Sequence, residues 1–370
     1  MFHFYITLAY IIPNIYVFFR IKNLFISKKY RGWYIMVYLL PAMIFPVSHN
    51  FLRHNSDFIS QFFSTVSGYL LPFFLYLFLS VLVFDLFLLL NLVFKIVSVE
   101  RRKSYSFRRA AFSSILFISA ATVIAGVINL NTIRVSTYNI TVPKKNSDIE
   151  NLRVAFVADF HIHQKTRPGF VRQFVRKVTA LDPDIILYGG DIIDGRGENA
   201  TSVEIESALK SIQTKYGAFG VLGNHEFYTG HDDGIFFEKA GITLLNDSVI
   251  RINDSFYLAG RYDEHYRNRK TVHEVLGNTP ADLPLILLDH RPTQLQEVSQ
   301  TPVDAQFSGH THNGQLFPLN YIIGRMYELS WGYRKIRNTH FFVTSGLRLW
   351  GPPVKTTGKS EIMLVDFRFE

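Results

Sequence analysis

Residues 309–315 read Gly-His-Thr-His-Asn-Gly-Gln, and this stretch is the last of five short polar blocks in the second two-thirds of the chain. The four earlier blocks are Asp159-Phe160-His161, Gly190-Asp191-Ile192-Ile193-Asp194, Gly223-Asn224-His225-Glu226 and Asp289-His290. Short apolar runs typical of buried strands precede these four blocks, over residues 153–158, 185–188, 219–222 and 285–288. The sequence therefore puts chemically active side chains where predicted strands end.

Helical patterns separate the predicted strands. Residues 169–181 carry apolar side chains at helical spacing, and residues 202–215 form a second such segment before the third strand. Strands that alternate with helices predict a layered α/β domain. Ligands of such domains bind beyond the carboxyl ends of the strands, so we expect the five polar blocks to meet at that edge.

The five blocks combine carboxylate and amide oxygens with histidine nitrogens, a set that favours manganese, iron or zinc over calcium. Residues i and i+2 of an extended segment point to the same side. Asp159 and His161 can therefore direct two ligands toward one centre, and the same spacing relates His310 and His312. The glycines at positions 190, 223 and 309 fit tight turns beside an ion or a phosphate.

These blocks, in this order and spacing, resemble the calcineurin-like metallophosphoesterase superfamily, and residues 309–315 look most like its membrane-associated bacterial branch. The resemblance covers about residues 132–370. It implies an α/β domain over residues 131–370, built as a four-layer αββα sandwich, with two divalent metal ions (manganese, iron or zinc). Carried over by motif, one ion is bound by Asp159, His161, Asp191 and His312, and the second by Asp191, Asn224, His290 and His310. His225 is then expected to hydrogen-bond the phosphate and protonate the leaving oxygen.

Metal-assisted hydrolysis needs no protein nucleophile, in agreement with a chain that has no cysteine. We expect Asp194, Glu226 and Asp289 to orient the ligating histidines. Two departures from the family pattern affect local geometry: Asn313 stands where many relatives have glycine, and Asp289 is an unexpected neighbour of His290.

Three further residues are candidates for substrate binding. Arg261 and Arg291 could each grip a phosphate with two hydrogen bonds, although solvated arginines are the favoured alternative. Trp350 lies in a segment that could form the rim of the site, where it could contact substrate or membrane.

Residues 1–130 have the character of a transmembrane domain of about four helices. Stretches 2–19, 33–47, 66–97 and 111–130 are long and apolar enough to approach or exceed the span of a hydrocarbon core, with three or five spans as alternatives. This part carries 12 of the 39 basic residues but only three of the 30 acidic ones, whereas the remainder carries 27 of each and is neutral. We therefore expect a lipid bilayer as partner and no nucleic acid.

Lysine and arginine cluster in the first and third loops between these stretches, and the second loop has only Arg53. The positive-inside rule then makes loops one and three cytoplasmic. With four spans, the catalytic domain of this integral protein of a bacterial inner or cell membrane lies outside the cytoplasm. Asp85, inside the third stretch, is expected to serve a contact between helices.

The stretch 321–333 is rich in aromatic and large apolar residues. A core-packed helix that closes the domain is the favoured reading, and an interfacial surface that lets the site reach lipid headgroups is the alternative.

The resemblance implies a metal-dependent hydrolase of a phosphomonoester, phosphodiester or pyrophosphate bond. The many spans favour a phosphorylated, membrane-borne, phospholipid-like substrate, with a phosphorylated small molecule as the broader class. One alternative is a UDP-2,3-diacylglucosamine pyrophosphatase of lipid A synthesis, although that substrate lies on the cytoplasmic side. The other is a membrane sensor that binds a ligand without catalysis.

Overall fold

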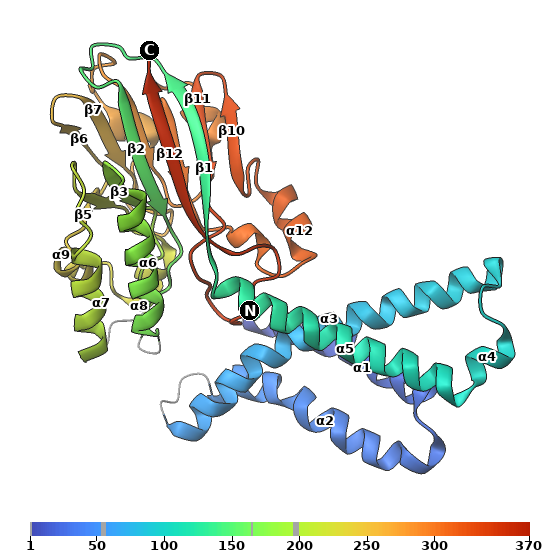
Figure 1. Cartoon of the computed structure of the whole chain (residues 1–370). Coiled ribbons are helices and arrows are strands. Elements are labelled where there is room, and N and C mark those ends of the chain that lie inside the picture. Colours follow the sequence, from blue (N-terminus) through green and yellow to red (C-terminus); the bar gives the residue numbers. More distant parts are fainter. Residues whose placement is uncertain (1, 53–56, 164–165, 195–199) are drawn as a thin grey trace. The chain divides into compact units, whose positions relative to one another are not determined.

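The computed structural model describes residues 2–52, 57–163, 166–194 and 200–370, which form two compact units (Figure 1). The helical unit extends to Ile128 and also includes Gly351–Thr356, and the α/β unit comprises Asn129–Trp350 and Thr357–Glu370. The division lies two residues before the expected boundary at residue 130. The assignment of residues 351–356 to the helices has no counterpart in the sequence pattern.

Four long helices dominate the N-terminal region: α1 (Phe2–Phe25), α2 (Arg31–Val47), α3 (Phe58–Phe94) and α5 (Tyr105–Leu130). Shorter helical turns flank them: η1 (Lys28–Tyr30), η2 (Ser48–Leu52) and α4 (Val99–Lys103). Three segments of the described chain are long and apolar enough to cross a membrane, Lys28–Leu52, Phe58–Phe94 and Tyr105–Leu130. At about 1.5 Å per residue, a helix as long as α3 exceeds a hydrocarbon core of about 30 Å, so it must tilt or project beyond the core.

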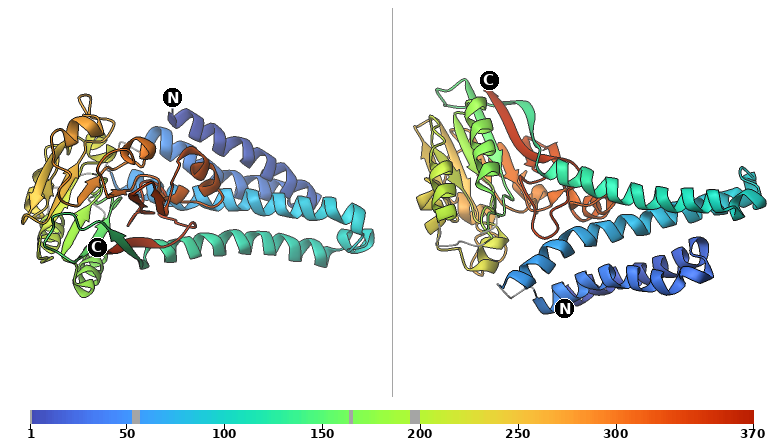
Figure 2. Two further views of the ribbon diagram at one scale, coloured as in Figure 1. Left: turned by 90° about the horizontal axis from the view of Figure 1, so that it is seen from above. Right: turned by 60° about the horizontal axis from the view of Figure 1, so that its bottom comes forward.

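Aromatic side chains join α1, α2 and α3, which lie side by side in Figures 1 and 2. Tyr10 packs on Phe45 and Phe74, with ring centroids 4.8 and 5.8 Å apart. The Tyr38 hydroxyl donates a hydrogen bond to the Asn14 carbonyl at 3.0 Å, so its polar atom is satisfied inside the bundle. Residues 351–356 pack against α5, where the Lys355 amide donates to the Gly126 carbonyl at 3.1 Å.

Both basic loops of the helical unit lie at one end of it. The Arg108 side chain donates to the Leu24 carbonyl at 2.6 Å. The Phe25 ring packs on Phe84 and Phe112 with centroids 5.5 and 5.6 Å apart. These contacts bring the end of α1 together with the end of α3 and the start of α5, which is the arrangement that two loops on the same side of a membrane require.

Asp85 of α3 forms an ion pair with Arg20 of α1, and the Tyr16 hydroxyl donates a hydrogen bond to the same carboxylate. The Arg20 Nε lies 2.9 Å from Asp85 Oδ2. The carboxylate thus has a contact role between helices, as expected, and its basic partner lies 65 positions away in the sequence.

We predict that Asp85→Asn lowers the stability of the full chain by about 1–2 kcal/mol, between the values of exposed and buried ion pairs, because Arg20 keeps its charge without a partner. The melting temperature in detergent measures this loss. The double variant Arg20→Leu with Asp85→Leu removes both charges and should recover most of it. Equal melting temperatures of wild type and Asp85→Asn would contradict the assignment.

The α/β unit contains two six-stranded sheets. The first has the order β1-β12-β2-β3-β4-β5, and the second the order β10-β11-β9-β8-β7-β6. Their bounds are β1 (Ile133–Val142), β2 (Asn151–Val157), β3 (Ile185–Tyr188), β4 (Ala218–Gly220), β5 (Thr243–Leu244), β6 (Ser248–Ile252), β7 (Phe256–Gly260), β8 (Leu285–Leu288), β9 (Ala305–Ser308), β10 (Gly332–Ile336), β11 (Thr339–Val343) and β12 (Ser360–Phe369).

The two sheets pack face to face and helices cover their outer faces (Figure 1), which gives the expected four layers. Phe156 of the first sheet and Phe307 of the second meet in the central layer with ring centroids 5.0 Å apart. The helices of this unit are α6 (Pro168–Leu181), α7 (Ala200–Lys210), α8 (Asn224–Thr229), α9 (Ile235–Lys239), α10 (Val272–Leu276), α11 (Leu295–Val298), η3 (His312–Gly314) and α12 (Leu319–Met326). The parallel strands β2, β3, β8 and β9 end at the polar blocks.

Helix α12 corrects the favoured reading of residues 321–333, because none of its residues is buried. Tyr321, Ile322 and Met326 are 65%, 58% and 68% exposed. Asn320 and Ile323 are half-buried, and the Asn320 backbone lies against Gly314. Large apolar side chains are therefore left on the outside, and a core-packed helix is wrong here.

Candidate metal centre

The chain turns sharply where β2 ends, and this turn positions the first two expected ligands. The Asp159 amide donates to the Gly190 carbonyl and the His161 amide to the Asp191 carbonyl, each at 3.0 Å. These bonds join the segment after β2 to the segment after β3. Asp159 and His161 both have left-handed backbone, with φ of 54° and 49°.

The same strained conformation recurs at other expected ligands. Asp191, His310 and His312 have φ of 51°, 70° and 49°. Residues with a Cβ adopt positive φ only where the surrounding structure requires it, and such positions gather at functional sites. Five of the seven expected metal ligands share this backbone, so the fold is strained in order to aim their side chains.

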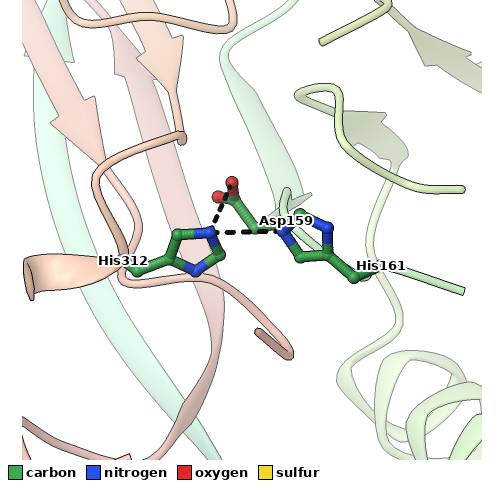
Figure 3. A group of neighbouring side chains, drawn as sticks. All are labelled: Asp159, His161 and His312. Atoms are coloured by element: carbon green, nitrogen blue, oxygen red, sulfur yellow. Dashed lines mark hydrogen bonds and ion pairs between the residues drawn. The ribbon is translucent and has the colours of Figure 1, made fainter. Parts of the chain in front are cut away.

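Asp159, His161 and His312 form the first group of ligand atoms (Figure 3). All three residues are buried, and one ligand atom from each lies within 4.8 Å of the others. The two Nε2 atoms of His161 and His312 are 3.2 Å apart, and His312 Nε2 is 3.5 Å from Asp159 Oδ1. The other ring nitrogen of His161, Nδ1, lies 2.7 Å from Asp194 and donates to that carboxylate, which leaves the Nε2 lone pair of the neutral ring free to bind a cation.

Asp191, His290 and His310 form the second group. His290 Nε2 lies 3.2 Å from both Asp191 Oδ2 and Asn224 Oδ1. His290 Nδ1 lies 2.7 Å from the Gly189 carbonyl, to which it donates, so the ring presents Nε2 to the carboxylate and the amide. The structure thus places Asn224 beside this group.

Asp191 also belongs to a third group with His161 and His225, and so links the two centres. Glycine is required beside these carboxylates. A Cβ at Gly223 would lie 2.2 Å from Asp191 Oδ1, and one at Gly309 would lie 2.4 Å from Asp159 Oδ2. The polar blocks therefore depend on glycine for close approach, as their composition indicates.

Buried acids hold the ligand segments in place. The Glu226 carboxylate accepts hydrogen bonds from the amides of Asp191, Ile192, Ile193 and Gly223, at 2.7–3.1 Å. Burial raises the pKa of Glu226 to about 7. Asp289, which the family pattern leaves unexplained, accepts from Arg261 at 2.9 Å and from Arg269 at 2.6 Å. Asp289 therefore anchors the segment that carries His290. Among the described residues, its side chain makes no hydrogen bond to a ligating histidine, so it does not orient one as expected.

The buried carboxylates of Asp159 and Asp191 favour positive charge at this site. Burial lowers the pKa of His290, but the carboxylates of Asp191 and Asp159 outweigh burial and raise that pKa to about 10. Burial raises the pKa of Asp159 to about 6. Burial and the nearby charge of His290 lower the pKa of His310 to about 3, so its ring is neutral and able to bind a cation. Carboxylates with neutral imidazoles are a suitable donor set for a divalent transition metal, which displaces protons when it binds.

His225 stands apart from the ligands because its side chain is partly exposed, at 18%. Its Nδ1 lies 3.0 Å from Asp194 Oδ1. The same carboxylate oxygen is hydrogen-bonded to His161 Nδ1. Burial opposes ionisation of Asp194, but these two histidines outweigh it and lower the pKa of Asp194 to about 2. Asp194 therefore fixes a ligand and the candidate acid together.

The three candidate substrate-binding residues lie in different environments. Arg261 is 3% exposed and is held by Asp289, so it is an internal ion-pair residue and not a solvated or substrate-facing one. Arg291 is mostly buried and donates to Asp263 at 2.7 Å. The Trp350 ring is partly exposed and lies 6.2 Å from the His225 ring, at the mouth of the site.

The sequence reasoning missed Asp263. This residue is fully buried, and its carboxylate accepts from Arg291 and from the His265 amide at 3.0 Å. A signal was present, because Asp263 comes three residues after the apolar run of β7, and the four earlier polar blocks also follow apolar runs. His265, which extends this network, also contacts the Tyr228 hydroxyl at 2.8 Å.

Comparison with known proteins identifies the family. Residues 152–314 match the family of calcineurin-like phosphoesterases. An uncharacterized metallophosphoesterase of Aquifex aeolicus is 30% identical over 64% of this chain and 92% of its own length. The chain belongs to the calcineurin-like metallophosphoesterases. It spans 59% of the length of a metallophosphoesterase of Helicobacter pylori that it matches.

Two other relatives carry more specific names. A "transmembrane protein with metallophosphoesterase domain" of Danio rerio is 28% identical over 91% of this chain and 80% of its own length. The UDP-2,3-diacylglucosamine pyrophosphatase LpxG of Chlamydia trachomatis is 25% identical over 55% of this chain and 78% of its own length. With three apolar helices long enough to span, this metallophosphoesterase is a membrane protein.

We predict that Asp191→Asn removes more metal from the full chain than Asp159→Asn does, because Asp191 belongs to two of the three ligand groups and Asp159 to one. Elemental analysis after dialysis against manganese measures the metal content. Asp232→Asn, an exposed acid outside the centre, is the control and should keep the wild-type content. Equal metal content in all four proteins would contradict the assignment.

Proposed function

We propose that this metallophosphoesterase is a membrane-anchored, dimetal-dependent enzyme that hydrolyses a phosphomonoester, phosphodiester or pyrophosphate bond, in a phospholipid-like substrate. One observation carries the proposal. Two groups of ligand atoms, Asp159/His161/His312 and Asp191/His290/His310, lie at the strand ends. Asp191 connects them, because it also lies in a third group with His161.

The protein groups have distinct tasks in this proposal. The aspartates and histidines hold the cations, and the Asn224 amide completes the second group beside His290. Two divalent ions, manganese, iron or zinc, supply a nucleophile from water at neutral pH and neutralise the phosphoryl charge when bound.

His225 delivers the proton. Its ring is partly exposed, and Asp194 holds Nδ1, so Nε2 is the nitrogen available to the substrate. In the protonated form, that nitrogen hydrogen-bonds a phosphate oxygen and protonates the leaving oxygen as the bond breaks. Asp194 stabilises the charged ring and prevents it from turning away.

A membrane-borne substrate accounts for the helical region. A single spanning helix anchors a protein irreversibly, and this chain has at least three segments able to span. The bilayer would then serve as the reservoir from which the substrate reaches the site. Trp350 at the mouth and Arg291 beside His290 remain candidates for contact with that substrate, but Arg291 must first leave Asp263.

A second candidate activity is cleavage of the pyrophosphate in UDP-2,3-diacylglucosamine. The similarity to the Chlamydia trachomatis pyrophosphatase favours it, since that relative matches over 55% of this chain. The third candidate is a ligand sensor without catalysis. It is less favoured, because a protein that has lost catalysis usually loses ligands, and six of the seven expected ligands lie in groups that could hold a metal ion.

We predict that His225→Ala lowers kcat by about 10²–10⁴, the usual contribution of a general acid, and leaves metal content unchanged. The assay uses the full chain in lipid nanodiscs with manganese and bis(p-nitrophenyl) phosphate, followed by lipid phosphates. His273→Ala, an exposed histidine on α10, is the control and should match wild type.

The same experiment separates the rival functions. If wild type binds metal but hydrolyses none of the phosphodiester, lipid-phosphate and UDP-diacylglucosamine substrates, the sensor replaces the enzyme. Preference for the UDP-linked substrate by at least about tenfold in kcat/KM would support the second candidate, since this difference corresponds to about 1.4 kcal/mol of transition-state binding.

A further inference from the structure

An apolar surface lies beside the metal centre and has no role in the proposed chemistry. It is formed by Phe317, Leu319, Tyr321, Ile322, Met326 and Trp331, each at least 38% exposed. We call it the α12 surface. At about 100° per residue, the four members within the helix and Arg325 fall on one face, and Asn320, Ile323 and Gly324 fall on the other.

The composition of the α12 surface suits the interface of a bilayer. Aliphatic side chains are joined by tyrosine and tryptophan, which prefer the level of the lipid headgroups. Arg325 adds a positive charge on the same face, and the helix contains no acidic residue. A short helix with this pattern suits shallow insertion among anionic lipids.

A bilayer is always within reach of this unit. Helix α5, one of the segments long enough to span, ends at Leu130, and strand β1 begins at Ile133. Only two residues therefore separate helix α5 from the first strand of the α/β unit. The presence of lipid follows from the chain itself and needs no additional partner.

The helix that carries the α12 surface is held next to the metal centre. The fifth polar block leads directly into α12, and the Gly314 backbone packs against Asn320 of that helix. The ring of Tyr327, which ends the helix, lies 6.2 Å from the His310 ring. The Thr311 hydroxyl donates to the Ser330 carbonyl at 2.5 Å, which ties the segment after α12 to the same block.

We propose that the α12 surface inserts into the headgroup region of the bilayer and thereby brings lipid phosphates to the metal centre. Insertion is a property of the surface alone. Delivery of a lipid phosphate rests on the proposed function, and it makes a bilayer lipid, not a soluble phosphoester, the substrate class of this site.

The test uses the full chain in nanodiscs of phosphatidylcholine and phosphatidylglycerol. The chain has no cysteine, so single cysteines can be introduced and spin-labelled without background. Ile322→Cys and Met326→Cys report on the α12 surface. Val203→Cys on α7, which is 59% exposed and apolar, is the matched control. Accessibility to oxygen, which concentrates in lipid, and to a water-soluble nickel chelate gives the depth of each label.

We expect labels at 322 and 326 to be accessible to oxygen and protected from nickel, whereas the label at 203 is accessible to nickel. Equal nickel accessibility at all three positions would overturn the proposal. Labels at 322 and 326 that neither reagent reaches would also overturn it, because protein and not lipid would then cover the surface.

A kinetic measurement tests delivery of the lipid. The ratio of kcat/KM for a lipid phosphate to kcat/KM for bis(p-nitrophenyl) phosphate should fall about tenfold in the double variant Ile322→Glu with Met326→Glu, since two buried apolar contacts are lost. Val203→Glu should keep the wild-type ratio. An unchanged ratio in the double variant would refute the delivery of lipid by the α12 surface. Inactivity of wild type on both substrates would refute the proposed function and would leave the result on insertion depth intact.

Discussion

The buried carboxylate of Asp191, shared between two groups of histidines, is the constraint around which the α/β unit is arranged. Burial opposes its charge, but the nearby rings of His290, His161 and His225 outweigh burial and lower its pKa well below the usual value. A charge of this kind is stable only if its neighbours cannot move away. Glu226 supplies that rigidity, since its carboxylate binds four amides of the two turns that carry Asp191 and Gly223. The strain of the left-handed ligand residues persists because the strands that support them are buried on both faces.

The sequence predicted the site better than the sheets around it. Apolar runs that stop at polar residues are local signals, and they located β2, β3 and β8 together with the ligands that follow them. Strand pairing depends on residues far apart in the chain. Strand β12 lies between β1 and β2, with Val365 opposite both Tyr138 and Val154, and no local pattern encodes that insertion. Arg20 and Asp85 are a similar case, because either residue looks like an isolated charge until the helices pack.

The errors on individual side chains have a common physical cause. Exposure follows from what a residue packs against, not from its own chemistry. Arg261 has the type of a surface residue, yet Asp289 draws it into the interior. Helix α12 has the composition of a core helix, yet none of its residues is buried and most of its large apolar side chains are exposed. Asn313, where glycine is usual, has φ of 49°, a conformation that asparagine adopts more readily than other residues with a Cβ. That departure therefore leaves the turn geometry intact.

The side of the membrane on which the site lies can be inferred without knowing the total number of spans. Helix α5 starts beside the end of α1, among the basic residues of both loops, and runs on to Leu130. If α5 crosses the bilayer, the chain beyond Leu130 lies opposite to the loop at residues 95–104, whether or not α1 also crosses. The positive-inside rule assigns that loop to the cytoplasm. Under this proposed topology the site would lie outside the cytoplasm, where a lipid phosphate of the outer leaflet would be available and a cytoplasmic nucleotide-linked lipid would not. This argument favours the phospholipid-like substrate over UDP-2,3-diacylglucosamine, and it makes a surface such as that of α12 useful for reaching that leaflet.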